Sequence, residues 1–408
     1  MADVMGYAPF NPDFKADPFA FYAHLRLDQP VHRTSLPGVG AVWLVTRYDD
    51  AVAVLSDPRF VKDTQNALTA DQMARLPKRT PALSLINQDM LSQDPPNHTR
   101  LRALVGKAFT PRLVERLRPR IQQLAAESLD RIAPLGKADL IEGYAFPIPI
   151  TVIAELLGVP VEDRNRFRSW SNAFISAPPT AESIERLAST VEDYVEYFRR
   201  LFELRRRDSQ DDLISALVRV EQDGDRLSEP ELFSMASLML IAGHETTVNL
   251  IGNGTLALLQ HPDQLERLRR EPELIRSAIE ELLRHSGPVE AATERYAAED
   301  IEIGGVTIRR GELVHVILGS ANRDGSRFVD PDEVDLTRDT RQHLAFGHGI
   351  HYCVGAPLAR LEGQVAIGAL IQRFPSLRLM VPPEELVWRP GIVIRGLAHL
   401  PVSFHTCD

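Results

Sequence analysis

The chain has 408 residues, of which 44% are hydrophobic and 25% are charged, and its formal net charge is −10. This composition is typical of a soluble globular protein that can bury a sizeable core. The negative charge argues against a general nucleic-acid binder. Two cysteines give no disulfide framework, and residues 1–17 have neither the basic start nor the apolar run of a signal peptide or membrane anchor. We therefore expect a cytoplasmic protein that is not bound to a membrane.

The N-terminal quarter combines a predicted hairpin with a long stretch of weak pattern. Residues 31–47 hold two β-rich runs around Pro37-Gly38, which predicts a β-hairpin, and a short helix is expected over 50–56. Between 60 and 96 prolines interrupt the pattern, which indicates a long loop. Such a loop can be a lid over a functional site or an irregular surface segment, and the sequence favours neither.

The rest of the chain is mainly helical. Helical patterns run from 97 to 285 with one break at Pro178-Pro179, and short strands follow, including 301–303 and 313–318. We predict a mainly α protein with a smaller β-rich part (α+β). The β-rich parts are expected at about 31–47 and 289–318 and in C-terminal strands, and the helical parts at about 97–285 and 354–373. No linker-like tract separates them, so residues 1–408 are interpreted as a single domain.

One segment points to chemistry. Residues 346–356 read Phe-Gly-His-Gly-Ile-His-Tyr-Cys-Val-Gly-Ala, and a helix is predicted over 356–374. Cys353 would lie at a helix entrance, where backbone N–H groups and the helix dipole favour a thiolate. Gly347, Gly349 and Gly355 let something flat and bulky come close. The segment indicates a thiolate presented to a metal, although a cysteine taken alone is more commonly a small buried hydrophobe.

The pattern Phe-Gly-x-Gly-x-His-x-Cys-x-Gly resembles the haem-binding loop of the cytochrome P450 family. The resemblance implies the P450 fold, with haem b (iron protoporphyrin IX) between a long distal helix and the helix that follows the cysteine. It makes Cys353 the proximal iron ligand, whose thiolate pushes electron density onto the iron and favours O–O cleavage. Phe346, Gly347 and Gly355 would belong to the cofactor site. The N-terminus is similar to those of soluble bacterial members.

The longest helical pattern, at 229–259, is the candidate distal helix. His244, Glu245, Asn249 and Asn253 interrupt its apolar run, which argues against a transmembrane helix and favours a buried one. Packing gives a core helix no reason to carry Gly243 next to such polar residues. A threonine can bond the carbonyl four residues back and bend the helix there.

The run Ala-Gly-His-Glu-Thr-Thr at 242–247 is similar to the oxygen-activating motif of the same family. The resemblance implies that a bulge at Ala242 and Gly243 makes room for O2 above the iron. Thr246 would hydrogen-bond the iron-bound oxygen, and Glu245 would feed protons inward through water. Standing alone, the pair would be interpreted as a capped or solvated hydroxyl and a carboxylate on the helix surface.

Glu281 and Arg284 lie three residues apart, on one face of a predicted helix. Taken by themselves they indicate an exposed ion pair worth less than about 1 kcal/mol. The resemblance implies a buried pair joined by a second arginine upstream of the cysteine loop, and Arg338 is the matching position. This trio would hold the loop that carries Cys353 and is structural rather than catalytic.

A haem brings two propionate carboxylates that need cationic or donor partners. The resemblance assigns this role to His98, Arg102, Arg295 and His351. His98 and Arg102 are separated by four residues, so a helix would present both on one face. Ordinary surface charge is the alternative for each of them.

The resemblance also indicates a substrate pocket with mainly apolar walls, as small-molecule pockets usually have. Its candidate residues are Leu83, Ile86, Met90, Phe174, Ile175, Leu240, Ala242, Val289, Ala291, Ala292, Ile392, Val393 and Ile394. Ala291 and Ala292 suggest a roomy site. Residues 288–295 and 388–397 are similar to those of bacterial members that oxidise macrolides and other polyketides in secondary metabolism. A terpene, a steroid or a fatty acid stays open as the substrate.

The implied function is that of a monooxygenase, which inserts one oxygen atom from O2 into a C–H or C=C bond. No Gly-x-Gly-x-x-Gly follows a predicted strand, so electrons are expected from a separate ferredoxin or flavodoxin with its NAD(P)H-dependent reductase. Arg112, Arg116 and Arg360 are candidates for docking that acidic partner. We expect a monomer. A gas-binding or gas-sensing haem protein and a peroxide-driven oxygenase are the alternatives. Tyr352 and Glu245 depart mildly from the family pattern.

Overall fold

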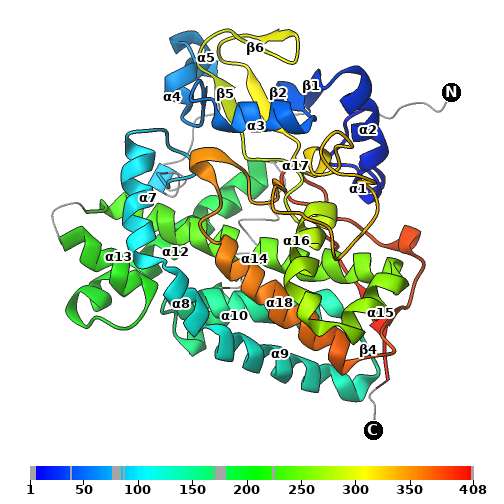
Figure 1. Ribbon diagram of the computed structural model, residues 1–408. Helices are drawn as coiled ribbons and strands as arrows, with labels where there is room; N and C mark the ends of the chain where they lie inside the picture. Colours follow the sequence, from blue (N-terminus) through cyan, green and yellow to red (C-terminus); the bar gives the residue numbers. More distant parts are fainter. Residues whose placement is uncertain are drawn as a thin grey trace. The chain divides into compact units, whose positions relative to one another are not determined.

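The computed structural model describes residues 6–36, 39–75, 84–85, 88–167, 169–170, 181–222 and 226–405 (Figure 1). The described chain forms two compact units. The first unit takes residues up to Val61, then Arg118–Ile148 and the chain from Thr246 onward; the second takes Lys62–Leu117 and Pro149–Glu245. The interpretation as one domain stays a prediction.

The first unit contains a five-stranded sheet with the order β1-β2-β8-β5-β3. Its strands are β1 (Val31–Leu36), β2 (Gly40–Val45), β3 (Phe60–Val61), β5 (Arg295–Ala297) and β8 (Leu313–Val316). β1 and β2 pair antiparallel with Val31 opposite Val45, which confirms the predicted hairpin, while Pro37-Gly38 lies outside the described residues. α3 (Tyr48–Ser56) contributes Val54 and Leu55 to the same core as Val314 and Val316.

The predicted strand over 313–318 was too long. β8 ends at Val316, and Leu318 begins the short helix α17 (Leu318–Ala321). The apolar run continues through this turn because Leu318 and Ala321 are buried in the same cluster as the strand. A continuous apolar run does not distinguish a buried strand from a buried helical turn.

Other elements of the first unit are short. A hairpin is made by β6 and β7, and a three-stranded sheet has the order β4-β10-β9. The remaining bounds are α1 (Pro12–Ala16), α2 (Phe19–Asp28), η1 (Ala133–Leu135), β4 (Lys137–Asp139), η2 (Ile141–Ala145), η4 (Pro272–Leu274), β6 (Ile301–Ile303), β7 (Val306–Ile308), η5 (Gly349–His351), β9 (Arg378–Leu379), η6 (Pro383–Glu385) and β10 (Pro401–Ser403). The predicted strand at 301–303 and the predicted C-terminal strands are confirmed.

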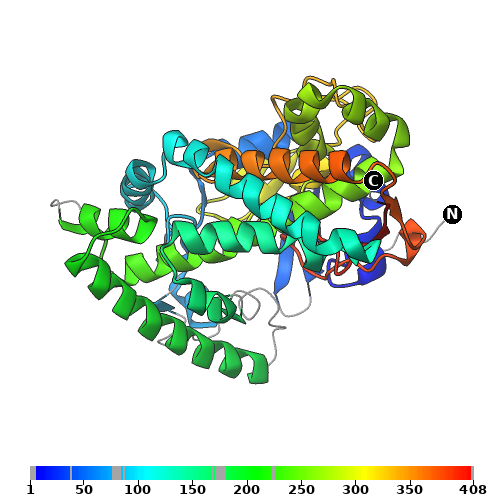
Figure 2. The ribbon, with the colours of Figure 1, turned by 90° about the horizontal axis from the view of Figure 1, so that it is seen from below.

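A group of long helices completes the first unit. α9 (Arg118–Ile132) and α18 (Ala356–Arg373) lie side by side, and α15 (Pro262–Arg270) and α16 (Ile275–Ser286) also contact α18 (Figures 1 and 2). Close packing needs a glycine at Gly363, where a Cβ would lie 3.0 Å from Leu250. The helix predicted over 356–374 is confirmed, and the cysteine loop therefore enters a buried, well-packed helix.

The second unit is helical. Its elements are α4 (Thr64–Ala67), α5 (Ala70–Arg75), α7 (Asn97–Ala108), α8 (Pro111–Arg116), α10 (Pro147–Leu156), η3 (Val161–Asp163), α12 (Ala181–Arg207), α13 (Leu213–Gln222) and the first part of α14 (Glu229–Gln260). The interpretation of 60–96 as a plain loop was wrong where it covers β3, α4 and α5. Helices of four to six residues are too short to show a period, and Asp63 begins α4 by accepting from the Gln65 N–H.

The observed mixture of many helices and smaller sheets confirms the predicted mainly α class with a β-rich part. Among the described residues, no helix is long and apolar enough to cross a membrane.

Candidate active site

The cysteine loop has a shape that its glycines make possible. Gly347 and Gly349 have φ angles of 73° and 72°, in the left-handed region that glycine tolerates best. At Gly349 a Cβ would lie 2.6 Å from the Leu55 carbonyl oxygen, so no other residue fits. The Cys353 N–H donates to the Phe346 carbonyl at 3.0 Å and closes the loop.

The thiol of Cys353 is exposed and lies just before α18, whose N-cap is Gly355. The alternative of a small buried hydrophobe is therefore wrong. A Cβ added at Gly355 would approach the Cys353 sulfur to 3.8 Å, so the glycine keeps that side of the sulfur uncovered. A thiol presented in this way, before a helix N-terminus, suits a metal ligand.

Arg360 does not offer the open positive charge expected for a docking residue. Its guanidinium donates to both carboxylate oxygens of Glu280, at 2.7 Å and 2.9 Å, and lies 4.5 Å from the centroid of the Phe346 ring. It also donates to the Tyr352 hydroxyl at 3.3 Å. Burial opposes ionisation of Glu280, but hydrogen bonds from His343 and Arg360 lower its pKa to about 2. Arg360 thus contacts Phe346 and Tyr352 of the cysteine loop, while Glu280 compensates the positive charge of Arg360.

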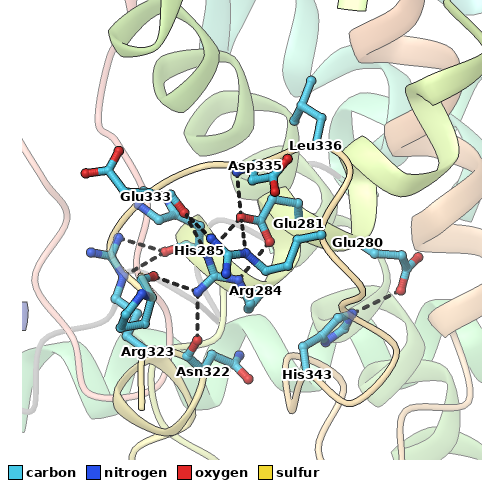
Figure 3. A network of polar contacts seen from close by, with 12 residues as sticks. Glu280, Glu281, Arg284, His285, Asn322, Arg323, Glu333, Asp335, Leu336 and His343 are labelled. Carbon is cyan, nitrogen blue, oxygen red and sulfur yellow. Dashed lines mark hydrogen bonds and ion pairs between the residues drawn. The ribbon is translucent and has the colours of Figure 1, made fainter. Parts of the chain in front are cut away.

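Glu281, Arg284 and Arg338 come together as the resemblance implied. Figure 3 shows Glu281 and Arg284 of this trio. Arg284 donates to the two oxygens of Glu281 at 2.7 Å and 2.8 Å, and Arg338 donates to Glu281 at 3.1 Å. The side chains of Glu281 and Arg284 are both 0% exposed, so the interpretation as an exposed pair was wrong. A charge pair buried this completely is costly to break from one side.

The same trio ties a strand-poor segment to α16. Arg284 donates to the carbonyls of Asn322, Pro331 and Glu333 at 2.7–3.0 Å. The Asp335 N–H donates to Glu281 at 2.9 Å. These bonds give hydrogen-bond partners to backbone carbonyl and N–H groups of a segment that has no regular strand pairing. Because residues 322–338 lead directly into the cysteine loop, the trio anchors the approach to Cys353.

α14 carries the second predicted motif. It is helical through residues 242–247, with Ala242 exposed and Thr246 half-buried four residues later on the same face. His244 and Glu245 are buried, and His244 Nδ1 lies 2.7 Å from the Leu240 carbonyl oxygen. Ala242 is the one exposed residue of 242–247, and Gly243 and Thr246 are half-buried.

The sequence analysis missed a packing reason for Gly243. A Cβ at this position would lie 3.0 Å from the Ile153 side chain on α10, so the glycine allows the two helices to approach closely. The signal was a glycine in a buried apolar helix, which can indicate close helix packing as well as a weakened turn. α14 is one continuous helix through the positions where the bulge was expected.

Glu362 is a buried acid that the sequence analysis did not single out. It lies on α18 and is 1% exposed, with both carboxyl oxygens covered by the protein. Burial raises its pKa to about 8, although the nearby Thr247 hydroxyl acts in the opposite direction. Glu362 therefore stays protonated in the folded protein well above the pH at which an exposed glutamate ionises.

Glu362→Gln is expected to stabilise the protein at pH 8 but not at pH 5. The folded pKa lies above the unfolded one, so the stability contribution of this carboxyl is present below the unfolded pKa and is lost as the pH rises towards 8. Glutamine mimics the protonated acid, and the gain at pH 8 should be roughly 1–3 kcal/mol. Urea unfolding at both pH values measures it, with exposed Glu302→Gln as the control. An equal effect at the two pH values would contradict this account.

The four predicted propionate partners divide between the units. His98 and Arg102 lie one turn apart on α7 in the second unit, and the pKa of His98 is lowered by burial and then by the Arg102 charge. Arg295 begins β5 in the first unit and is 4% exposed, and His351 ends η5 half-buried. Their binding role stays a prediction.

Six predicted pocket residues belong to two paired segments of the first unit. Val289 and Ile394 form an antiparallel bridge, and the Ala291 N–H donates to the Val393 carbonyl at 3.4 Å. The Ala292 N–H donates to the Val316 carbonyl of β8 at 2.8 Å. We call residues 288–292 and 392–395 the wall segments. Ile392 completes the set of six.

The other predicted pocket residues are less informative. Met90 and Leu240, in the second unit, are buried at 6% and 0% exposure. Four predicted residues lie outside the described residues, namely Leu83, Ile86, Phe174 and Ile175.

The donor set fits a haem. The exposed Cys353 thiol would be the ligand that the protein gives to the iron, beside Gly355. A porphyrin brings its own nitrogen ligands, so one protein thiolate would be enough.

The chain resembles known proteins along nearly its whole length. Residues 163–386, more than half of the chain, match the family described as Cytochrome P450. The chain is 49% identical to cytochrome P450 monooxygenase PikC of Streptomyces venezuelae, over 98% of this chain and 94% of that protein. It is 45% identical to 6-deoxyerythronolide B hydroxylase of Saccharopolyspora erythraea, over 96% of this chain and 97% of that protein.

The fold agrees with these relatives. The solved structure of the bacillaene polyketide synthase cytochrome P450 PksS of Bacillus subtilis superposes with a TM-score of 0.91 at 42% identity, covering 98% of this chain and 100% of that one. Together with an exposed thiol in a loop shaped by glycines, these likenesses show that the chain belongs to the cytochrome P450 family and is a haem b-dependent monooxygenase.

Proposed function

We propose that this monooxygenase oxidises a polyketide or macrolide, inserting one oxygen atom of O2 into a C–H or C=C bond. The observation that carries the proposal is the pairing of the two wall segments, which bring six apolar side chains together in the unit that presents Cys353. Relatives named as a hydroxylase of 6-deoxyerythronolide B and as a polyketide synthase P450 support this substrate class. Ala291 and Ala292 are buried, so the half-buried side chains of Val289 and residues 392–394 are the ones that could face a substrate.

The proposed roles follow from each residue's chemistry. Cys353 would hold the haem iron as a thiolate, and His98, Arg102, Arg295 and His351 would bind its propionates by charge-assisted hydrogen bonds. The bound haem supplies the oxygen-activating chemistry. Apolar wall residues would orient the substrate and exclude water.

Thr246 and Glu245 would move protons on the distal side. Glu245 is 5% exposed and Thr246 follows it on the face of α14 that also carries Ala242. A hydroxyl in this position can hold a proton donor in place, and a buried carboxylate can relay protons from water. Ala242 leaves space for a small molecule on this face.

Thr246→Ala is the test of this function. We expect oxygen and NAD(P)H consumption to continue while product formation falls about tenfold or more and peroxide rises, because protons no longer arrive at the right place. Product, peroxide and NAD(P)H are measured together with a macrolactone substrate, and Thr307→Ala, at an exposed position of the β6–β7 hairpin, is the matched control. A gas-binding protein would show no coupled turnover in either form. Turnover that requires added peroxide would indicate a peroxide-driven oxygenase.

We propose that electrons reach the haem from a separate ferredoxin or flavodoxin, with the chain acting as a monomer in the cytoplasm. Arg112 and Arg116 on α8 are the candidate docking charges, although Arg116 also lies 3.3 Å from Asp211. Arg360 is a weaker candidate because Glu280 compensates its charge.

Arg112→Glu is expected to slow reduction by an acidic ferredoxin about tenfold at low salt and to flatten the salt dependence of the rate. Stopped-flow reduction at several salt concentrations measures both. Arg310→Glu at the surface serves as the control, and an unchanged rate and salt slope for Arg112→Glu would contradict the docking proposal.

A further inference from the structure

A buried ion pair joins the N-terminal helix α1 to both wall segments. Lys15 is 0% exposed, and its ammonium donates to a carboxylate oxygen of Glu290, which is 2% exposed. The same ammonium donates to the Ile394 carbonyl at 3.3 Å. Glu290 lies between Val289 and Ala291 in one wall segment, and Ile394 lies in the other. One cation therefore contacts both segments at once.

Two further side chains complete this arrangement. The Tyr22 hydroxyl on α2 donates to the second oxygen of Glu290. Arg395 donates to the carbonyls of Lys15 and Ala16 at 3.2 Å and 3.0 Å, and its guanidinium carbon lies 3.5 Å from the centroid of the Trp388 ring. We call Lys15, Tyr22, Glu290 and Arg395 the clasp. It connects residues that are 275 positions apart in sequence, and its four members all belong to the first unit.

Stability alone does not account for the clasp. Burial lowers the pKa of Lys15 and lowers that of Arg395 to about 10, while the Glu290 charge acts in the opposite direction on both. Apolar residues of similar volume often replace a buried ion pair without loss of stability. An ammonium that donates to both wall segments, in contrast, holds the groups that it bonds at a fixed spacing.

The backbone of Glu290 is hydrogen-bonded on both sides, so a shift of Glu290 would move the wall segments. Its N–H donates to the Val393 carbonyl at 2.8 Å, and its carbonyl accepts from the Gly319 N–H at 3.0 Å. The Arg395 N–H donates to the Pro288 carbonyl at 2.8 Å. Two backbone hydrogen bonds that join the two wall segments are thus made by Glu290 and Arg395, whose side chains belong to the clasp.

We propose that Lys15 is a positioning residue that sets the spacing of the two wall segments and thereby determines which bulky ligands the pocket accepts. The inference rests on the proposed function, because the wall segments must line the substrate pocket. Lys15 contacts one segment through a side chain and the other through a backbone carbonyl. Its removal leaves the backbone pairing of the segments in place but frees Glu290 to turn towards Tyr22 alone.

The test compares a small and a bulky ligand of the iron in the holoprotein. Imidazole reports only on access to the haem, whereas clotrimazole also extends against the pocket wall, and both shift the haem absorbance when they bind. In Lys15→Met we expect the Kd of clotrimazole to rise about tenfold and the Kd of imidazole to change by less than about twofold. Tyr22→Phe keeps the ion pair and should raise the clotrimazole Kd less.

A control separates positioning from general destabilisation. Tyr144→Phe removes a buried hydrogen bond of 2.7 Å to the Ala366 carbonyl on α18, elsewhere in the first unit. It should leave the ratio of the two Kd values unchanged. If Lys15→Met fails to fold, the double variant Lys15→Met/Glu290→Gln removes both charges and should show the same selective loss of clotrimazole binding.

The outcomes distinguish the two proposals. An unchanged ratio of the two Kd values in Lys15→Met, or an equal weakening of both ligands, would overturn the positioning role. Wild-type protein that binds imidazole but shows no preference for bulky apolar ligands would instead contradict the proposed substrate class. A selective loss of clotrimazole in Lys15→Met and not in Tyr144→Phe would support the positioning role.

Discussion

Cys353→Ser is expected to abolish the red-shifted absorbance of the reduced, carbon-monoxide-bound protein and to lower monooxygenase turnover more than about a hundredfold. The exposed sulfur before α18 is the only side chain of the cysteine loop that can give a thiolate ligand. A serine hydroxyl has a similar size but is not ionised at neutral pH, so the electron donation to the iron is lost. The absorbance spectrum under carbon monoxide and product formation measure the two effects.

The second cysteine provides the control. Cys407→Ser changes the same kind of side chain near the C-terminus and should keep the thiolate spectrum. If the Cys353→Ser protein kept that spectrum, another ligand would hold the iron and the assignment of Cys353 would fail.

Glu281→Gln is expected to lower the free energy of unfolding by about 3–5 kcal/mol, because it leaves Arg284 as a buried charge without its counter-ion. Arg284 would keep its bonds to the carbonyls of Asn322, Pro331 and Glu333, but Arg338 would lose an anionic acceptor. The Asp335 N–H would lose the same acceptor (Figure 3). Since the anchored segment leads into the cysteine loop, haem content should fall as well. Urea unfolding followed by circular dichroism, together with the haem absorbance per protein, measures both.

Glu302→Gln is the matched control, because Glu302 is exposed on the β6–β7 hairpin. A loss below about 1 kcal/mol for Glu281→Gln would be typical of a surface ion pair and would contradict the buried trio.

Much of the fold could be predicted because it depends on local pattern. The hairpin, the helix after Cys353 and the long α14 have clear periodicity, turn residues or caps. The errors have a local origin too. α4 and α5 have four and six residues, which is less than two helical turns and too few to show a periodic pattern. The apolar run of β8 continues into a helical turn.

The candidate site was predictable where a motif is contiguous and was not where it depends on long-range contacts. The sequence placed Cys353 at a helix entrance and Glu281 beside Arg284, because neighbours along a helix share a face. The compensation of Arg360 by Glu280 and the buried acid at Glu362 depend on helices packed from distant parts of the chain. No local spacing in the sequence predicts that Arg360 and Glu280, which lie 80 positions apart, will meet.

The sequence by itself determined the family motif, the helical class and the candidate thiol, since glycine and cysteine in one short loop already specify its backbone and its chemistry. Only the tertiary structure decided which charges are buried and which are open. Burial is a property of everything that packs around a group, and Lys15 and Glu290 are brought together by the fold although they lie 275 positions apart in the sequence.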